Sequence, residues 1–363
     1  MKILVQKENL ERALGFVEKV ASKNAALPIL SNILIRTNEG RLQISATNLE
    51  IGVVSAIGAK ITEEGQIAVP GRIFSDFVRG VKNETLTLST KQNTLFVDGG
   101  SMKTSILGFD ATEYPIIPKI NQANPYTLPA QTLQSMLGNI TDSIALSESR
   151  PELAGAFVSF LNDSTVVAAT DSFRLAEQRR TNNNPTVATV IIPRGTVMEL
   201  LHILGSVTGD IAIRVADNQI EFSHSDCQII SRLIDGRYPE YHKVIPERYI
   251  AKVLVHKKEL ENAIKTTALF SSSISDVKVD CENGALTISA KNSSKGEAQA
   301  TMKANLKGDP FNITVNHHYF LDGLKIIPTE TVVIEFTGNG SPFVLRPSDD
   351  KKEGVYLIMP LRN

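Results

Sequence analysis

The feature that most constrains the fold of this chain is an internal repeat. The segment LQISAT at residues 42–47 recurs as TVVAAT at 165–170 and as LTISA at 286–290. Farther along, VPGRIF at 69–74 aligns with IPRGTV at 192–197 and with VNHHYF at 315–320. A third anchor is a leucine near the start of each unit: Leu10, Leu133 and Leu260. Because three anchors recur in the same order at nearly constant spacing, the sequence predicts three fused copies of one domain of about 120 residues.

Each repeat carries the same pattern of predicted elements. A short strand leads into a helix with apolar residues at i, i+4 and i+7, as in Leu10, Leu14 and Val17. Two strands joined by turn residues follow, then a second helix with apolar positions such as Phe74 and Val78, then further alternating strands. This pattern predicts an α+β fold in which two helices of each repeat pack against many antiparallel strands. Composition shifts place the predicted domains at residues 1–121, 122–250 and 251–363.

Composition narrows the class of protein. The 363 residues contain 38 basic and 39 acidic side chains, so net charge favours neither nucleic acid nor an acidic partner. No apolar run reaches the length of a membrane span, and the first residues become charged too soon for a signal peptide. Cys227 and Cys281 form no CxxC motif, which argues against a disulfide framework or a zinc site. We therefore expect a cytoplasmic protein.

Motifs of catalysis are missing from the sequence. There is no GxSxG, Walker GxxxxGK, HExxH or helix-opening GxGxxG segment. The one His pair, His317 and His318, has no third metal ligand nearby in sequence. The stretch Thr170–Arg174 mixes an acid, a hydroxyl and a base, but capping of a turn explains it without catalysis. We expect no enzymatic activity, no bound metal and no cofactor.

Several segments together resemble one protein family. They are LPIL at 27–30, ATDSFRLA at 169–176, DGRYP at 235–239 and YLIMPLR at 356–362. With the triple repeat, these motifs resemble the bacterial DNA sliding clamp, the β subunit of DNA polymerase III, over the whole chain. The resemblance implies the DNA clamp fold, in which two three-domain chains close head-to-tail into a ring. Helices then line a central hole that holds duplex DNA, and sheets form the outside.

The resemblance also implies how DNA is held. A ring retained by topology needs few tight phosphate contacts, which suits a near-neutral chain that must slide. Basic residues at or near the helices would line the hole: Lys23, Arg72, Arg79, Arg150 and Arg194. The resemblance places all of them except Arg79 at or next to positions that face DNA. We expect Arg72 and Arg194 to be exposed. The implied DNA binding is independent of base sequence, and a partner ATPase would load the ring.

A peptide site between the second and third domains is the next implication. There the family binds short linear peptides of DNA polymerase III α subunit, the clamp loader and other proteins. The residues at the corresponding positions are Leu153, Thr170, Ser172, Phe173, Arg174, Leu175, Pro239, Lys243, Val244, Pro342, Met359, Pro360, Leu361 and Arg362. Leu175, Val244 and residues 359–361 are expected to form an apolar cup, and Arg174 to hydrogen-bond the peptide backbone. The sequence departs from the usual family pattern at Ser172, Phe173, Lys243, Pro342 and Asn363.

A homodimer closed by the first and third domains is implied as well. The resemblance places Lys103, Thr104 and Ile106 of one chain against Leu269 and Phe270 of the other. Leu269 and Phe270 follow a predicted helix, where an exposed apolar pair favours an interface.

Two other interpretations remain open at the level of sequence. One is a three-repeat protein-interaction scaffold that does not bind DNA, and composition does not separate it from a clamp. The other, more distant, is a triplicated enzyme, which a cleft with convergent polar groups would support.

Overall fold

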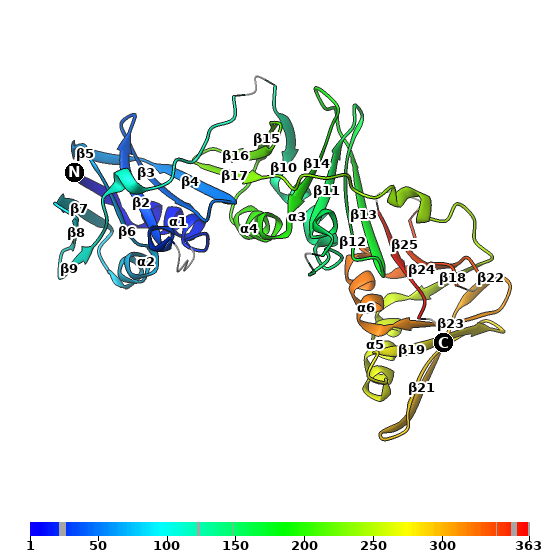
Figure 1. The fold of residues 1–363 in the computed structure, drawn as a ribbon. Helices are drawn as coiled ribbons and strands as arrows, with labels where there is room; N and C mark the ends of the chain where they lie inside the picture. Colours follow the sequence, from blue (N-terminus) through cyan, green and yellow to red (C-terminus); the bar gives the residue numbers. More distant parts are fainter. Residues whose placement is uncertain (22–26, 122–123, 148, 339, 350–353, 362–363) are drawn as a thin grey trace. The chain divides into compact units, whose positions relative to one another are not determined.

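The computed structural model describes residues 1–363 except 22–26, 122–123, 148, 339, 350–353 and 362–363. The chain divides into two compact units. Unit 1 contains Met1–Gln134 and Met198–Leu233, and unit 2 contains Ser135–Val197 and Ile234–Asn363. Each unit combines helices with antiparallel sheets (Figure 1), so the predicted α+β class is confirmed.

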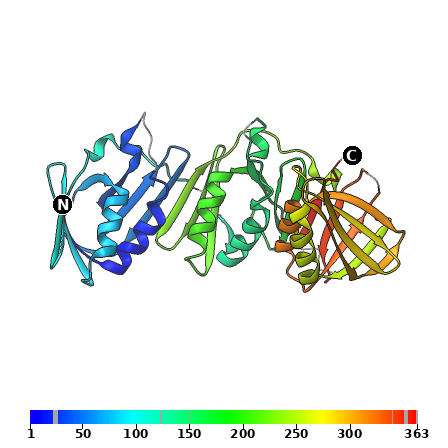
Figure 2. The ribbon, with the colours of Figure 1, turned by 90° about the horizontal axis from the view of Figure 1, so that it is seen from below.

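Six α-helices occur in the described residues, two in each repeat as the sequence predicts. They are α1 (Lys7–Val17), α2 (Gly71–Gly80), α3 (Ala130–Thr141), α4 (Arg194–Leu204), α5 (Lys257–Thr267) and α6 (His317–Ile326). The apolar stripe of α1 is buried at Leu10, Leu14 and Val17. Helices α1 and α2 lie side by side against the strands of unit 1 (Figure 2). The helices therefore bury one face and leave the opposite, more polar face exposed.

Unit 1 holds two sheets in its described part. The first has the order β5-β1-β7-β8-β9, with bounds Ala59–Glu63, Lys2–Gln6, Thr85–Lys91, Thr94–Gly99 and Met102–Leu107. The second has the order β10-β15-β16-β17-β4-β3-β2-β6, with bounds Tyr126–Pro129, Asp210–Val215, Gln219–His224, Cys227–Arg232, Ile51–Ile57, Arg41–Thr47, Asn32–Asn38 and Gln66–Pro70. In the second sheet, β4 of the first repeat pairs with β17 of the second repeat. We call this pairing the first junction.

Unit 2 is built in the same manner. One sheet has the order β14-β11-β12-β13-β26-β25-β24-β18-β22, with bounds Ala188–Pro193, Gly155–Phe160, Ser164–Thr170, Arg174–Thr181, Gly354–Ile358, Phe343–Pro347, Thr331–Phe336, Ala251–His256 and Asn305–Gly308. The other has the order β21-β20-β19-β23, with bounds Gly296–Lys303, Ala285–Asn292, Asp276–Glu282 and Phe311–Asn316. Here β13 of the second repeat pairs with β26 of the third (Figure 1), and we call this the second junction.

Candidate functional site

The turn between β12 and β13 is fixed by its own side chains. Thr170 Oγ1 donates to the carbonyl oxygen of Arg174 at 2.7 Å and accepts from the Ser172 N–H at 3.1 Å. Asp171 Oδ1 accepts from the N–H groups of Phe173 and Arg174 at 2.9 and 3.0 Å. These bonds hold Ser172 at φ +78°, a left-handed conformation that few non-glycine residues adopt. The turn is therefore a rigid platform that presents Phe173 outward.

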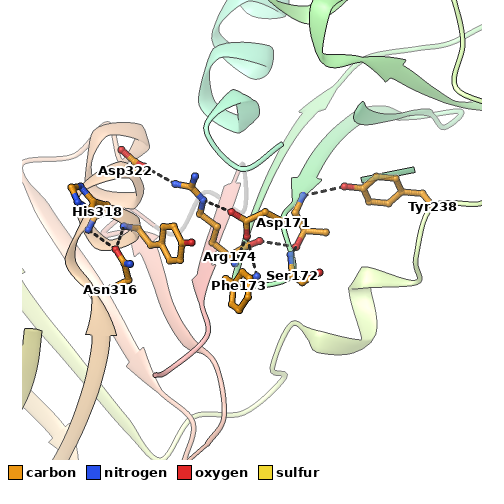
Figure 3. Close-up of polar contacts among 10 residues, drawn as sticks. Asp171, Ser172, Phe173, Arg174, Tyr238, Asn316, His318 and Asp322 are labelled. Carbon is orange, nitrogen blue, oxygen red and sulfur yellow. Dashed lines mark hydrogen bonds and ion pairs between the residues drawn. The ribbon is translucent and has the colours of Figure 1, made fainter. Parts of the chain in front are cut away.

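Arg174 ties this turn to the third repeat. Its Nε donates to Asp171 Oδ2 at 2.9 Å, and its Nη1 donates to Asp322 Oδ2 of α6 at 2.6 Å (Figure 3). The guanidinium lies over the Tyr319 ring, 4.4 Å from the centroid. The side chain is only 13% exposed. Two of its nitrogens thus already have carboxylate partners, and hydrogen bonding of Arg174 to a peptide backbone stays a prediction.

The apolar residues of the predicted cup differ in burial: some form a buried floor, and others are exposed above it. Leu153 and Leu175 are buried in a core cluster with Tyr238 and Tyr241, so they support the surface rather than form it. That Leu175 is part of the cup stays a prediction. Phe173 and Val244 are 59% and 50% exposed. Large apolar side chains exposed above a packed floor are typical of a docking surface.

The C-terminal strand reaches the same turn. Met359 packs against the core cluster, and its N–H donates to the carbonyl oxygen of Phe173 at 2.8 Å. The Leu361 N–H donates to the carbonyl oxygen of Thr314 at 2.8 Å. Residues 170–175 and 359–361, far apart in sequence, therefore lie together as predicted. Arg362 lies outside the described residues.

The remaining predicted members of the site have local roles. Pro239 and Pro360 are half-buried. Lys243 is exposed and forms an ion pair with Glu240. The carbonyl oxygen of Pro342 accepts from Thr337 Oγ1 at 2.7 Å, just before β25. For these residues, membership of a peptide site stays a prediction.

The basic residues predicted to face DNA have different surroundings. Arg72 is widely exposed on α2, as expected. Arg79 pairs with Glu18 and with Asp76, and Arg150 pairs with Glu152 at 3.0 Å. Arg194, at the start of α4, is half-buried rather than exposed, and its Nε has no hydrogen-bond partner in the described part of the chain. Lys23 is among the residues that the structure does not describe.

The predicted interface residues lie at two sheet edges and beside a helix. Strand β9 ends its sheet, and there Lys103 is exposed and pairs with Asp98 at 2.8 Å, while Thr104 is half-buried. Ile106 is buried at 5% exposure, whereas the neighbouring Leu107 is 78% exposed. Of these two neighbours Leu107 is thus the one that faces outward, and a role of Ile106 at the interface stays a prediction. Leu269 is 68% exposed, and Phe270 is half-buried near Gly296 of β21.

Three residues around the turn at 170–174 were not predicted from the sequence. The Tyr238 hydroxyl accepts from the Thr170 N–H at 3.1 Å, and burial raises the pKa of Tyr238 (Figure 3). Tyr319 and Asp322 complete the surroundings of Arg174. A signal existed for Tyr238, because a Tyr-Pro pair recurs at Tyr114 in the first repeat. No local pattern marks Asp322, whose partner lies far away in sequence.

The described residues contain neither a cluster of potential metal ligands nor a helix suited to cross a membrane. His317 and His318 place their ring centroids 4.0 Å apart, yet no group of three or more potential metal ligands occurs in the residues that the structure covers. Among those same residues, no helix is both long and apolar enough to cross a membrane.

Family models match nearly the whole chain in order. The DNA polymerase III beta subunit N-terminal domain matches residues 1–118, its central domain matches 127–240, and its C-terminal domain matches 242–362. The domain limits predicted from composition, at 121 and 250, stay predictions, since the compactness of the fold divides the chain into two units instead.

Similar proteins agree with the family models. A beta sliding clamp of Staphylococcus epidermidis is 28% identical over 375 residues and one of Chlamydia pneumoniae is 28% identical over 366, each covering 100% of this chain and 99% of the relative. Solved structures include a DNA polymerase sliding clamp of Bacillus subtilis (26% identity, TM-score 0.96) and a DNA polymerase III beta subunit of Thermotoga maritima (26%, TM-score 0.94). Each covers 100% of this chain and 99% of the solved chain. By its sequence and its fold, the chain belongs to the DNA polymerase III beta subunit family.

Proposed function

We propose that this protein is a processivity factor for DNA polymerase, a sliding clamp that encircles duplex DNA and holds a polymerase on it. The match of three clamp domain models in order along the chain carries this conclusion. It favours the clamp over a repeat scaffold that does not bind DNA, because the relatives are named sliding clamps. The protein acts without catalysis or a cofactor, and it acts in the cytoplasm, where the chromosome is replicated.

The surface at the second junction is the proposed docking site for partner peptides. Phe173, Val244 and Met359 offer apolar contact area above a buried floor. Two apolar anchors of an extended peptide gain about 3–6 kcal/mol by burial there, and ordering the peptide takes back part of that gain. A dissociation constant on the order of micromolar follows, which lets polymerase and repair proteins exchange on one ring. A solved Pseudomonas aeruginosa sliding clamp with 25% identity is bound to griselimycin, so that clamp accepts a ligand.

Two copies of the chain close the proposed ring. The free edge strand β9, with Leu107 outward, meets the region of Leu269 and the free edge strand β21 of the partner. Unpaired strand edges tend to pair with other strands, and in the proposed dimer this tendency brings β9 of one copy to β21 of the other. Arg72, Arg79, Arg150 and Arg194, with Lys23, are the proposed contacts to DNA phosphates.

A primer-extension experiment tests the proposed function. The cognate polymerase and clamp loader copy a long primed circle with or without this protein, under conditions in which each polymerase binds once. We expect the products to lengthen at least tenfold when the protein is present. Products of unchanged length with an active loader contradict the proposal.

A further inference from the structure

The turn that presents Phe173 has a second copy in the first repeat. Thr47 Oγ1 donates to the carbonyl oxygen of Ile51 at 2.9 Å and accepts from the Leu49 N–H at 3.0 Å. Asn48 Oδ1 accepts from the N–H groups of Glu50 and Ile51 at 3.0 and 2.8 Å. The Tyr114 hydroxyl accepts from the Thr47 N–H at 3.2 Å, as Tyr238 does from Thr170. Apart from the side-chain bond between Arg174 and Asp171, each of these hydrogen bonds of the second turn thus has a counterpart in the first.

The strand pairing beside the turn is repeated too. At the second junction the Met359 N–H donates to the carbonyl oxygen of Phe173 at 2.8 Å. At the first junction the Arg232 N–H donates to the carbonyl oxygen of Glu50 at 2.9 Å. Glu50 and Arg232 therefore occupy the places of Phe173 and Met359. The backbone frame of the proposed peptide site exists twice in the chain, and what differs is the side chains on it.

A cavity of about 250 Å³ lies at the first junction. It is lined by the turn, by the segment Pro115–Pro118 and by β17 residues that include Arg232. Ile116 is 93% exposed and Leu49 is 43% exposed. Leu49 also has φ +76°, a conformation that costs a leucine more than a glycine. A strained, exposed leucine beside a cavity is the kind of outlier that points to binding.

The charged residues of this cavity are available to a ligand. Glu50 and Arg232 are both exposed, and neither takes part in an ion pair within the described residues. Both side chains leave the same pair of hydrogen-bonded backbone segments and line the same cavity. An apolar partner alone would leave both charges unmatched, whereas a peptide with an apolar side chain next to charged ones matches the whole cavity.

We propose that the first junction is a second peptide-binding site, which takes an extended segment with a leucine-like side chain flanked by charged residues. The apolar side chain contacts Leu49 and Ile116, and the flanking charges pair with Glu50 and Arg232. The inference rests on the proposed function only in that the second junction supplies the template of a peptide site. Because the apolar contact area is small, the dissociation constant is about hundreds of micromolar. Such a site serves as a weak additional contact for a partner already held at the second junction.

A fluorescence titration of the full-length protein tests this proposal. Lys119→Cys places a thiol at an exposed position just after the cavity-lining segment Pro115–Pro118, and an environment-sensitive dye is attached there, since both native cysteines are buried. The probe is a blocked octapeptide with one leucine between an aspartate and a lysine, and the control peptide has serine instead of leucine. We expect a saturable change with the leucine peptide up to about 1 mM and no change with the serine peptide.

Matched variants locate the binding. Leu49→Gly removes the side chain and relieves the positive φ, so the turn still forms, and we expect at least tenfold weaker binding. Phe173→Ala alters the second junction and should leave the signal of the dye at position 119 unchanged. If peptides fail to bind at the second junction but still bind at the first, the result counts against the proposed function and not against this inference. An equal response to the serine peptide, or an unweakened response in Leu49→Gly, overturns the inference. So does a signal that changes with protein concentration in the absence of peptide, because a second copy of the chain would then cover the site.

Discussion

Arg174 shows how one side chain can hold two repeats together. It is nearly buried, and its charge is balanced by Asp171 in its own turn and by Asp322 on α6. Removing one partner of such a pair leaves the other charge poorly compensated in a region of little water. The geometry of the turn that presents Phe173 therefore depends on a residue in a different repeat.

Asp322→Asn should destabilise the protein by about 1–2 kcal/mol, since Arg174 loses one carboxylate and keeps the other. Urea denaturation followed by circular dichroism measures the change. Glu261→Gln is the matched control, because it removes an ion pair with Lys265 on the exposed surface of α5, and such pairs contribute below about 1 kcal/mol. If both substitutions lower the free energy of unfolding equally, the contacts of Arg174 contribute no more to stability than an exposed ion pair.

The two cysteines provide a prediction about pH. Burial raises the pKa of Cys227 to about 12, with Glu199 and Asp226 adding to the effect, and burial raises the pKa of Cys281 to about 11. We expect a thiol reagent at pH 8 to modify neither cysteine until the protein unfolds. Rapid modification of one thiol in the native protein would contradict the packing around it.

The same shifts predict how stability depends on pH. Both folded pKa values lie above the ordinary thiol value of 9.0, so the folded state holds more protons than the unfolded state above that pH. The contribution of the thiols to stability is therefore complete below about pH 9 and is lost as the pH rises toward the folded pKa values. Denaturation midpoints measured from about pH 8 to 11 test this. The variant Cys227→Ser should show a shallower decline.

At the scale of elements, the sequence predicts helices better than it predicts which face of a strand is covered. The stripe of Leu10, Leu14 and Val17 has one helical face, and all three residues are buried. Ile106 and Leu107 are adjacent and both apolar, so alternation alone is compatible with either facing inward. The buried one is Ile106, because the other strands of its sheet set the register.

The residues of the second junction also differ in how far the sequence predicts them. The motif at 169–176 and the terminal YLIMPLR marked both halves of the second junction, and the pairing of β13 with β26 brings them together. The burial of Leu175 and the contact of Arg174 with Asp322 were not predictable, because each depends on a neighbour distant in sequence. Local motifs identify what a site contains, whereas tertiary packing decides which side chains remain exposed.

The C-terminal segment provides a prediction at the scale of one element. Deleting residues 360–363 removes the bond from Leu361 to Thr314 while keeping Met359 in place beside Phe173. We expect peptide binding at the second junction, followed by fluorescence anisotropy, to weaken at least tenfold. The truncated protein should still dimerise, since β9, β21 and Leu269 are untouched. A truncated protein that binds a polymerase-derived peptide as tightly as the full chain would place the docking site elsewhere.

At the scale of the whole molecule, the proposed ring needs two chains to close. Leu107 and Leu269 are exposed apolar side chains near the proposed contacts, and burying two such side chains contributes about 3–6 kcal/mol per interface. Leu107→Asp should therefore shift the protein toward monomer in sedimentation equilibrium. Val187→Asp, at another exposed apolar position before β14, is the control and should leave the dimer intact. A wild-type protein that is monomeric at micromolar concentration would contradict the ring.

Topological retention on DNA tests the central claim most directly. The protein is loaded on a nicked circular plasmid by its clamp loader, freed of the loader by gel filtration, and followed after the plasmid is cut once. We predict that it stays on the circle in high salt and leaves within minutes of linearisation, because a closed ring slides off a free end without breaking phosphate contacts. Equal retention on circular and linear DNA would contradict the claim that this protein encircles the duplex.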